Sequence, residues 1–116
     1  QLFNGDGDKV IELEDLFARK MGFRNVCLVT GQTYSRKTDS RVMAVLSGLG
    51  QTLHKVGTDV RLLQHDGEMQ EPFGETQVGS SAMPYKRNPM RSERMCSLAR
   101  YLVNESHNAE MTAMTQ

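Results

Sequence analysis

The feature that most constrains the fold is a regular spacing of large apolar residues between positions 38 and 64. The spacing alternates between four and three residues along Val42, Leu46, Leu49, Leu53, Val56, Val60 and Leu63. Such a heptad pattern is typical of helices that pack at a shallow angle in a bundle. It predicts one long helix over about residues 38–64 and an all-α fold in which this helix belongs to a bundle.

The length of this helix limits what the rest of the chain can cover. At 1.5 Å per residue it is about 40 Å long, whereas a compact chain of 116 residues has a radius of gyration of about 13 Å. The apolar seam therefore needs partners beyond this chain, in an oligomer or in a larger bundle of which the chain is a segment. We expect Leu46, Leu49, Leu53 and Val56 to stay partly exposed in a single copy.

Three glycines, Gly48, Gly50 and Gly57, lie inside the expected long helix. Each costs a helix about 1 kcal/mol relative to alanine. Gly50 and Gly57 are one heptad apart and so share a face, which predicts close approach by a neighbouring helix. The alternative interpretation is a weakness that the helix tolerates.

Two further helices are expected on either side. An amphipathic helix over about residues 8–21 has Asp6 or Asp8 as its cap and Gly22 as its stop. The apolar run at 26–29 fits either a strand or a buried extended connector. A last helix is expected from about residue 89, with Asn88 as N-cap and proline in its first position; its pattern weakens after residue 104.

Residues 66–87 interrupt all helical periodicity. Five glycine and proline residues break the segment, namely Gly67, Pro72, Gly74, Gly79 and Pro84. A loop of this length without structure of its own is usually functional or disordered. We expect a flexible segment here; as a functional loop it would be a catalytic loop that closes over a bound substrate and opens again to release product.

Polar side chains lie at the end of this loop and in the first turns of the last helix. They are Ser80, Ser81, Lys86, Asn88, Glu93 and Arg94. A helix N-terminus attracts anions, and lysine and arginine add donors for a carboxylate or phosphate. The pattern indicates an anion site with two hydroxyls nearby, although a solvated Ser/Gly loop before a capped helix remains the alternative.

Charge and composition exclude several other classes of function. Lysine plus arginine and aspartate plus glutamate each number 14, which argues against a nucleic-acid partner. No metal-ligand spacing occurs, so no metal is expected, and no apolar run is long enough to span a membrane. Cys27 and Cys96 lie far apart and are interpreted as reduced thiols of a cytoplasmic protein.

The residues of the loop also carry a resemblance. Residues 79–94, GSSAMPYKRNPMRSER, resemble the loop motif of the fumarase/aspartase superfamily, broadly GSS-x-MP-x-K-x-NP. The run YKRNPMRSER and residues 30–37, TGQTYSRK, are similar to the adenylosuccinate lyase family of the animal type. The similarity extends from about residue 3 to about residue 103, and more loosely to the end.

The resemblance implies that residues 1–116 are a partial central helical domain of such a lyase, a cytoplasmic homotetramer with active sites shared between subunits. The implied reaction is a β-elimination of fumarate in purine biosynthesis, without metal or organic cofactor. The substrates would be the purine nucleotide adenylosuccinate, which gives AMP, and the succinylated imidazole carboxamide ribotide.

The resemblance also implies roles for single residues. Ser80 matches the catalytic base, with Ser81 as the alternative. Lys86 and Asn88 would stabilise charge on the substrate carboxylate. From its position in the following helix, and not from the resemblance, Glu93 is expected to orient one of them. The remaining matches are substrate-binding positions, namely Gln32, Ser81, Met83 and Arg94.

Two features of the family are missing from this sequence. The Thr-His dipeptide that carries the family's general acid does not occur, and His54, His65 and His107 fit packed or solvated histidines better. The downstream phosphate-binding stretch is also absent, so the chain alone is expected to be inactive. Alternatives are a superfamily lyase for argininosuccinate, fumarate or aspartate, and an inactive helical fragment that only associates with other helices.

Overall fold

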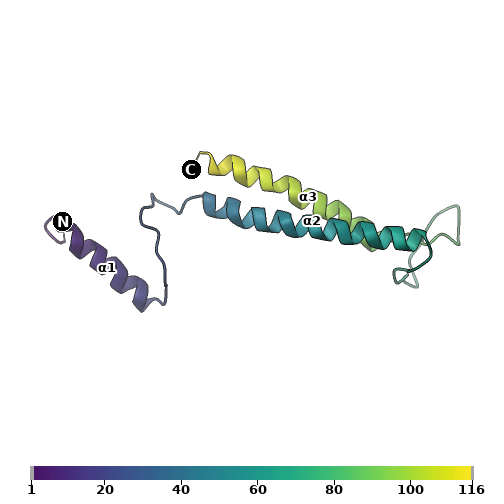
Figure 1. Cartoon of the computed structure of the whole chain (residues 1–116), viewed down its shortest axis with the longest axis horizontal. Coiled ribbons are helices and arrows are strands. Elements are labelled where there is room, and N and C mark those ends of the chain that lie inside the picture. Colours follow the sequence, from purple (N-terminus) through teal and green to yellow (C-terminus); the bar gives the residue numbers. More distant parts are fainter. Residues whose placement is uncertain (1, 116) are drawn as a thin grey trace. The chain divides into compact units, whose positions relative to one another are not determined.

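A computed structural model describes residues 2–115. In chain order, α1 spans Gly7–Lys20, α2 spans Lys37–His65 and α3 spans Met90–Ala113 (Figure 1). Residues 2–115 contain no strand, which confirms the predicted all-α fold. None of their helices is long and apolar enough to cross a membrane. The chain divides between Tyr34 and Ser35 into two units, and each is described by itself.

The first unit contains α1, and local sequence signals set both of its ends. The Asp6 carboxylate accepts a hydrogen bond from the backbone N–H of Lys9 at 3.3 Å, so Asp6 and not Asp8 is the cap. At the other end Gly22 has φ +80°, the left-handed conformation that glycine adopts without strain. The Phe23 N–H bonds the Ala18 carbonyl at 2.9 Å, so the helix stops where the sequence predicts.

The apolar run at 26–29 forms neither a helix nor a strand. Leu28 is 95% exposed and Val29 is 90% exposed. The expectation of a strand or a buried connector is therefore wrong for this chain. The run is an irregular and largely exposed segment.

In the second unit, α2 and α3 lie side by side and run in opposite directions (Figure 1). The long helix is one residue longer at each end than the heptad pattern predicts. Small residues make the contact between the two helices. The buried ones are Ser47, Gly50 and Gly57 on α2, and Ser92, Cys96, Ala99 and Ser106 on α3.

Two glycines bring the helix backbones together. A methyl group on Gly57 would lie 2.7 Å from Cys96 Sγ and 3.1 Å from the Ser92 carbonyl oxygen. A methyl group on Gly50 would lie 3.3 Å from the Ala99 carbonyl oxygen. By contrast, Gly48 faces open space. The prediction of close approach at Gly50 and Gly57 is confirmed.

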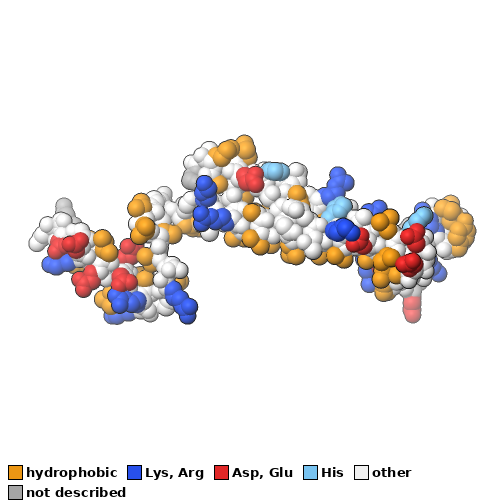
Figure 2. All heavy atoms as spheres, viewed as in Figure 1, with side chains coloured by type: hydrophobic (Ala, Val, Ile, Leu, Met, Phe, Trp, Pro, Cys, Tyr) orange, Lys and Arg blue, Asp and Glu red, His pale blue; other side chains and the backbone are white. Residues whose placement is uncertain are grey.

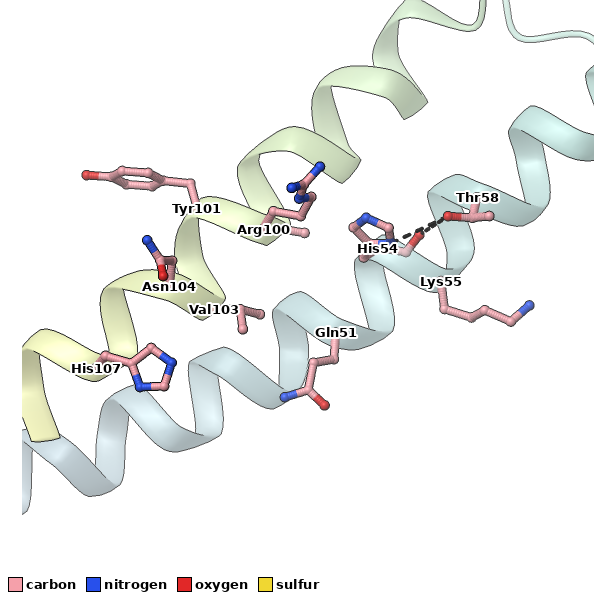
Figure 3. A pocket seen from close by; sticks show the side chains of 10 residues that line it. Gln51, His54, Lys55, Thr58, Arg100, Tyr101, Val103, Asn104 and His107 are labelled. Atoms are coloured by element: carbon pink, nitrogen blue, oxygen red, sulfur yellow. Dashed lines mark hydrogen bonds between the residues drawn. The ribbon is translucent and has the colours of Figure 1, made fainter.

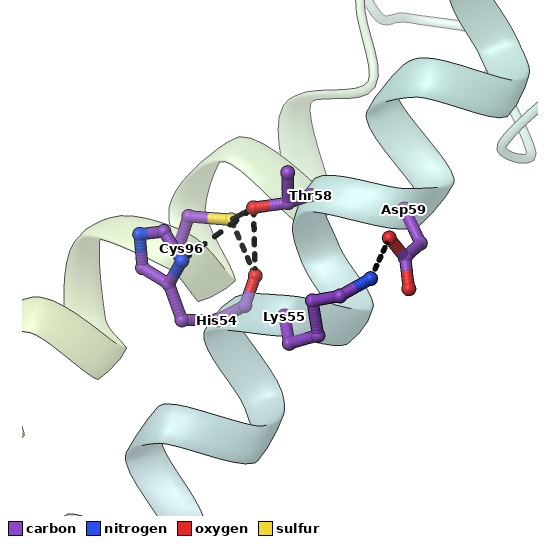
Figure 4. Close-up of polar contacts among 5 residues, drawn as sticks. All are labelled: His54, Lys55, Thr58, Asp59 and Cys96. Atoms are coloured by element: carbon purple, nitrogen blue, oxygen red, sulfur yellow. Dashed lines mark hydrogen bonds and ion pairs between the residues drawn. The ribbon is translucent and has the colours of Figure 1, made fainter.

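A small group of polar contacts lies in the middle of this interface (Figure 4). The His54 carbonyl accepts a hydrogen bond from Thr58 Oγ1 at 2.9 Å and one from Cys96 Sγ at 3.6 Å. The His54 ring is half-buried, with Nδ1 3.5 Å from Thr58 Oγ1. His54 is thus a packing residue with local partners, as the sequence indicates.

Contact with α3 leaves the apolar seam of α2 partly uncovered. Leu46, Leu49, Leu53 and Val56 are 37%, 51%, 37% and 47% exposed, and Figure 2 shows hydrophobic side chains at the surface of the second unit. The expectation that these residues stay partly exposed in one copy is confirmed. Small residues allow the backbones to approach, and Leu53 of the seam lines a hollow beside α3 together with Leu98.

The start of α3 differs from the prediction. The helix begins at Met90, its N-cap is Pro89, and no side chain of the cap residue bonds to it. Asn88 is not the N-cap: the Arg91 and Ser92 N–H groups donate to the Glu71 carboxylate, and Asn88 Nδ2 donates to the Gly79 carbonyl. The far end of α3 extends to Ala113, through the region where the sequence pattern weakens.

Candidate active site

Ser80 stands in a tight turn of the loop that joins α2 to α3. Its Oγ accepts hydrogen bonds from the backbone N–H groups of Ala82 and Met83, both at 3.2 Å. The residue is half-buried, whereas the neighbouring Ser81 is exposed. The two candidate serines therefore differ in environment, since a pair of amide donors surrounds only the oxygen of Ser80 among the described contacts.

The two N–H groups at Ser80 Oγ affect how well this serine can act as a base. A serine hydroxyl is a weak base unless its proton is removed and the resulting negative charge is stabilised. Fixed backbone N–H groups that point at the oxygen stabilise such a charge without reorganisation. The N–H groups of Ala82 and Met83 are the kind of donors that would stabilise a charge on Ser80 Oγ.

The segment from Gly79 to Asn88 closes on itself around this turn. Asn88 Nδ2 donates to the Gly79 carbonyl at 2.7 Å, and the Lys86 N–H donates to the Met83 carbonyl at 3.0 Å. A methyl group on Gly79 would lie 1.9 Å from the Lys86 carbonyl oxygen. Only glycine fits at residue 79, and this contact keeps the Ser80 turn beside Lys86.

A hollow of about 410 Å³ opens where the loop meets the last turns of α2. Lys86, Asn88 and Glu93 line it, and so do Arg61 and His65 of α2. Three of the predicted catalytic residues are therefore brought together. Glu93 makes no side-chain hydrogen bond to Lys86 or Asn88 within residues 2–115, so its expected orienting contact is not formed.

Other predicted residues lie apart from this hollow. Arg94 lines a neighbouring hollow with Leu53 and Leu98, because successive residues of a helix point in different directions. Gln32 belongs to the first unit and is exposed. Met83 is exposed in the serine turn. Within the second unit, the loop gathers Ser80, Met83, Lys86 and Asn88, but not Arg94.

Sequence reasoning missed two residues that hold the loop, Gln64 and Glu71. The Gln64 side-chain amide bonds to the backbone of both Glu71 and Arg87. The Glu71 carboxylate accepts from the backbone N–H groups of Arg91 and Ser92, at 2.8 Å and 2.9 Å. No local signal marks these residues, because their partners lie far along the chain.

The surroundings of Glu71 favour its ionised form. Desolvation raises its pKa, but hydrogen bonds from the Ser92 hydroxyl and from the Arg91 and Ser92 amides outweigh this effect. The nearby Arg91 charge adds to them, and the pKa of Glu71 lies below its ordinary value. A negative charge at the N-terminus of α3 is also favourable because of the helix dipole.

A larger hollow, of about 770 Å³, lies along the middle of α2 and α3 (Figure 3). His54 and Lys55 of α2 line it, with Arg100 and His107 of α3. Lys55 pairs with Asp59, and His107 Nδ1 lies 3.2 Å from Glu110 Oε2. Neighbours on the same helix thus occupy most of its charged groups, and none of the predicted site residues lines it.

Comparison with known proteins identifies the family. The model of the family described as Lyase matches residues 11–103. This chain belongs to the Lyase family. The matched range of the lyase chain includes every residue that the sequence predicts for the site, from Gln32 to Arg94.

Curated relatives of the lyase chain share more than half of its residues. It is 56% identical to the adenylosuccinate lyase of Schizosaccharomyces pombe and 53% identical to those of Schistosoma mansoni and Saccharomyces cerevisiae. Each match covers 115 residues, which are 99% of this chain and 24% of the relative. The chain thus spans about a quarter of the length of these relatives, and the resemblance found in the sequence is confirmed.

Proposed function

We propose that this chain supplies the serine loop of an adenylosuccinate lyase. The proposed reaction is the β-elimination of fumarate from adenylosuccinate, which leaves AMP, and from the succinylated imidazole carboxamide ribotide of purine biosynthesis. One observation carries the proposal: the loop lies within a stretch that is 53–56% identical to three adenylosuccinate lyases. No metal or organic cofactor is assigned to this chemistry.

In this proposal Ser80 is the general base. As an oxyanion it removes a proton from the carbon beside a substrate carboxylate, and the electron pair then forms the double bond of fumarate while the C–N bond breaks. An acid protonates the leaving nitrogen. The two amide N–H groups at Ser80 Oγ support this assignment over Ser81, because they stabilise the charged form of the base.

Lys86 and Asn88 are proposed to stabilise the substrate carboxylate while charge develops on it. Their position on one hollow beside the serine turn supports this role, and Lys86 forms no ion pair within residues 2–115 that would compete. Glu93 lines the same hollow. We assign it the task of orienting Lys86 or Asn88 once substrate is bound.

Gln32, Ser81, Met83 and Arg94 are proposed to contact substrate. We infer a homotetramer in which different subunits contribute to each site. The exposed seam of α2 and the location of Arg94 on a separate hollow support this arrangement. The general acid is assigned to residues outside this sequence, so the chain alone is expected to lack activity.

We also infer a cytoplasmic location. The thiols of Cys27 and Cys96 are free, the first exposed and the second buried. An exposed free thiol is typical of a reducing compartment.

The proposal is tested by a substrate panel on the full-length protein that carries this chain. Adenylosuccinate, argininosuccinate, aspartate and malate are supplied in turn, and fumarate is measured by its absorbance. We expect release from adenylosuccinate alone. A faster release from another substrate would assign the protein to a different lyase of the superfamily, and no release from any of them would favour a helical piece without activity.

A further inference from the structure

A single side chain of α2 holds both ends of the serine loop. Gln64 lies in the last turn of α2 and is half-buried. Its Oε1 accepts from the Glu71 N–H at 2.9 Å, and its Nε2 donates to the Arg87 carbonyl at 2.8 Å. The two contacts need an acceptor and a donor on one side chain, which only an amide of this length provides.

Glu71 carries the connection on to α3. Its Oε2 accepts from the Arg91 N–H at 2.8 Å, and its Oε1 accepts from the Ser92 N–H at 2.9 Å and from Ser92 Oγ at 2.7 Å. The first amides of a helix have no partner within the helix. Because Pro89 gives no side-chain cap, the carboxylate from the loop replaces it.

The serine turn lies between these two points of attachment. Arg87 is fixed by Gln64, and its guanidinium lies 4.1 Å from the centre of the Phe73 ring. The residue before it, Lys86, is in contact with the backbone of Gly79, next to Ser80. A shift of either attachment is therefore transmitted to both Ser80 and Lys86.

We propose that Gln64 and Glu71 are positioning residues that hold the serine loop in its reactive geometry. Together they connect the end of α2, both ends of the loop and the start of α3. The inference rests on the proposed function of Ser80 and Lys86, and it assigns neither Gln64 nor Glu71 a contact with substrate. Proton removal and charge stabilisation must occur together, so the spacing of Ser80 and Lys86 matters most in the transition state.

The test uses two substitutions that keep size and shape, Gln64→Glu and Glu71→Gln, in the full-length protein. Gln64→Glu removes the donor to Arg87, and Glu71→Gln replaces one acceptor oxygen by an NH₂ group. Matched controls are Gln70→Glu and Glu75→Gln. Both control residues are exposed in the same loop and make no side-chain hydrogen bond within residues 2–115.

Three quantities are measured for each variant: kcat and KM for adenylosuccinate, the thermal midpoint, and hydrogen exchange of residues 71–92 without substrate. In Gln64→Glu and Glu71→Gln we expect kcat to fall about 10- to 100-fold with KM changed less than about 3-fold. Exchange in 71–92 should rise in both, and the controls should match the wild type. The double variant should lose little more than the larger single loss, because both changes break one connection.

Unchanged exchange of residues 71–92 in both variants would overturn the inference, whatever happens to activity. A loss of activity that disappears when kcat is expressed per folded protein would overturn it too, because it would show a role in stability alone. Full activity of Ser80→Ala would instead refute the proposed function. Since exchange is measured without substrate, it would then still decide whether Gln64 and Glu71 hold the loop.

Discussion

Where α2 meets α3, small side chains and backbone atoms make the contact, whereas the loop that joins these helices is held by the amide of Gln64 and the carboxylate of Glu71. At Gly57 the two helices are so close that a single methyl group would collide with Cys96. In the loop the fixed points are hydrogen bonds of 2.8–2.9 Å to backbone groups and one of 2.7 Å from the Ser92 hydroxyl to Glu71.

The two regions should therefore respond to different changes. The helix pair is sensitive to volume, because close packing leaves no room for added atoms. The loop is sensitive to loss of a hydrogen-bonding group and to protonation, because few of its apolar side chains are buried. The proposed base Ser80 lies in the region that directional hydrogen bonds hold, and such bonds fix orientation more closely than apolar contacts do.

The largest expected effect is on the chemical step. Ser80→Ala in the full-length protein should lower kcat by about 10²- to 10⁴-fold, the usual contribution of a general base. KM and the thermal midpoint should change little, because within residues 2–115 Ser80 Oγ bonds only to amides of its own turn. Steady-state kinetics and thermal unfolding check both. Ser81→Ala is the matched control, and a reversed result for the two serines would transfer the role of base to Ser81.

The next largest effect is expected at the apolar seam of α2. Replacing Leu49 and Leu53 by serine should weaken association between copies, since each buried leucine contributes about 1.5–3 kcal/mol. Light scattering on the full-length protein should show a smaller mass at equal concentration, and activity should fall with it. Val45→Ser is the control, because Val45 is 74% exposed and lies off the seam. An unchanged mass would contradict a seam between copies.

A pair of glycine substitutions separates close packing from helix propensity. Gly57→Ala should lower the free energy of unfolding by about 1–3 kcal/mol through overpacking against Cys96 and the Ser92 backbone. Gly48→Ala should raise it by up to about 1 kcal/mol, because Gly48 faces open space and alanine favours helix. Thermal unfolding of the full-length variants checks the opposite signs. Equal shifts for both positions would show that Gly57 is not tightly packed.

The smallest effect is the pH dependence contributed by Glu71. Its pKa is lower in the folded chain, so its stabilisation is complete above the pKa of the unfolded state and disappears as the pH falls through the folded pKa. Glu71→Gln should cost an amount at the low end of the range for helix caps, about 0.5–2 kcal/mol, at neutral pH. Thermal midpoints of wild type and variant should begin to converge only as the pH falls below about 4, the ordinary range of a glutamate pKa. A difference in thermal midpoint between wild type and Glu71→Gln that stays constant with pH would contradict an ionised cap. Glu75→Gln provides the control.

Much of the helical architecture was predictable because its determinants are local. The heptad spacing gave α2 to within one residue at each end, and the shared face of Gly50 and Gly57 identified the surface that approaches α3. Gly22 ends α1 as expected. Of the candidate site, the order Gly79-Ser80 followed by Lys86 and Asn88 was visible as a motif, and the structure brings these residues together.

The contacts that hold the loop could not be predicted from the sequence. Asn88 satisfied the local rule for an N-cap, yet its amide bonds the Gly79 carbonyl, and a carboxylate twenty positions earlier caps α3 instead. When the capping residue is far away in sequence, no characteristic spacing of residues predicts the cap. The same holds for Gln64, whose two partners are on either side of the serine turn.

The sequence by itself determined which segments are helical, where α1 ends and which face of α2 is small enough for close contact, because these properties depend on neighbours within one or two helical turns. Only the tertiary structure decided that the small face of α2 meets α3 while the leucine seam remains partly exposed, and that Glu71 and Gln64 hold the serine turn. Those outcomes depend on which of several competing contacts form together. Backbone groups at the start of α3 and at Arg87 must be satisfied, and the residues that satisfy them are brought near only when the two helices pack.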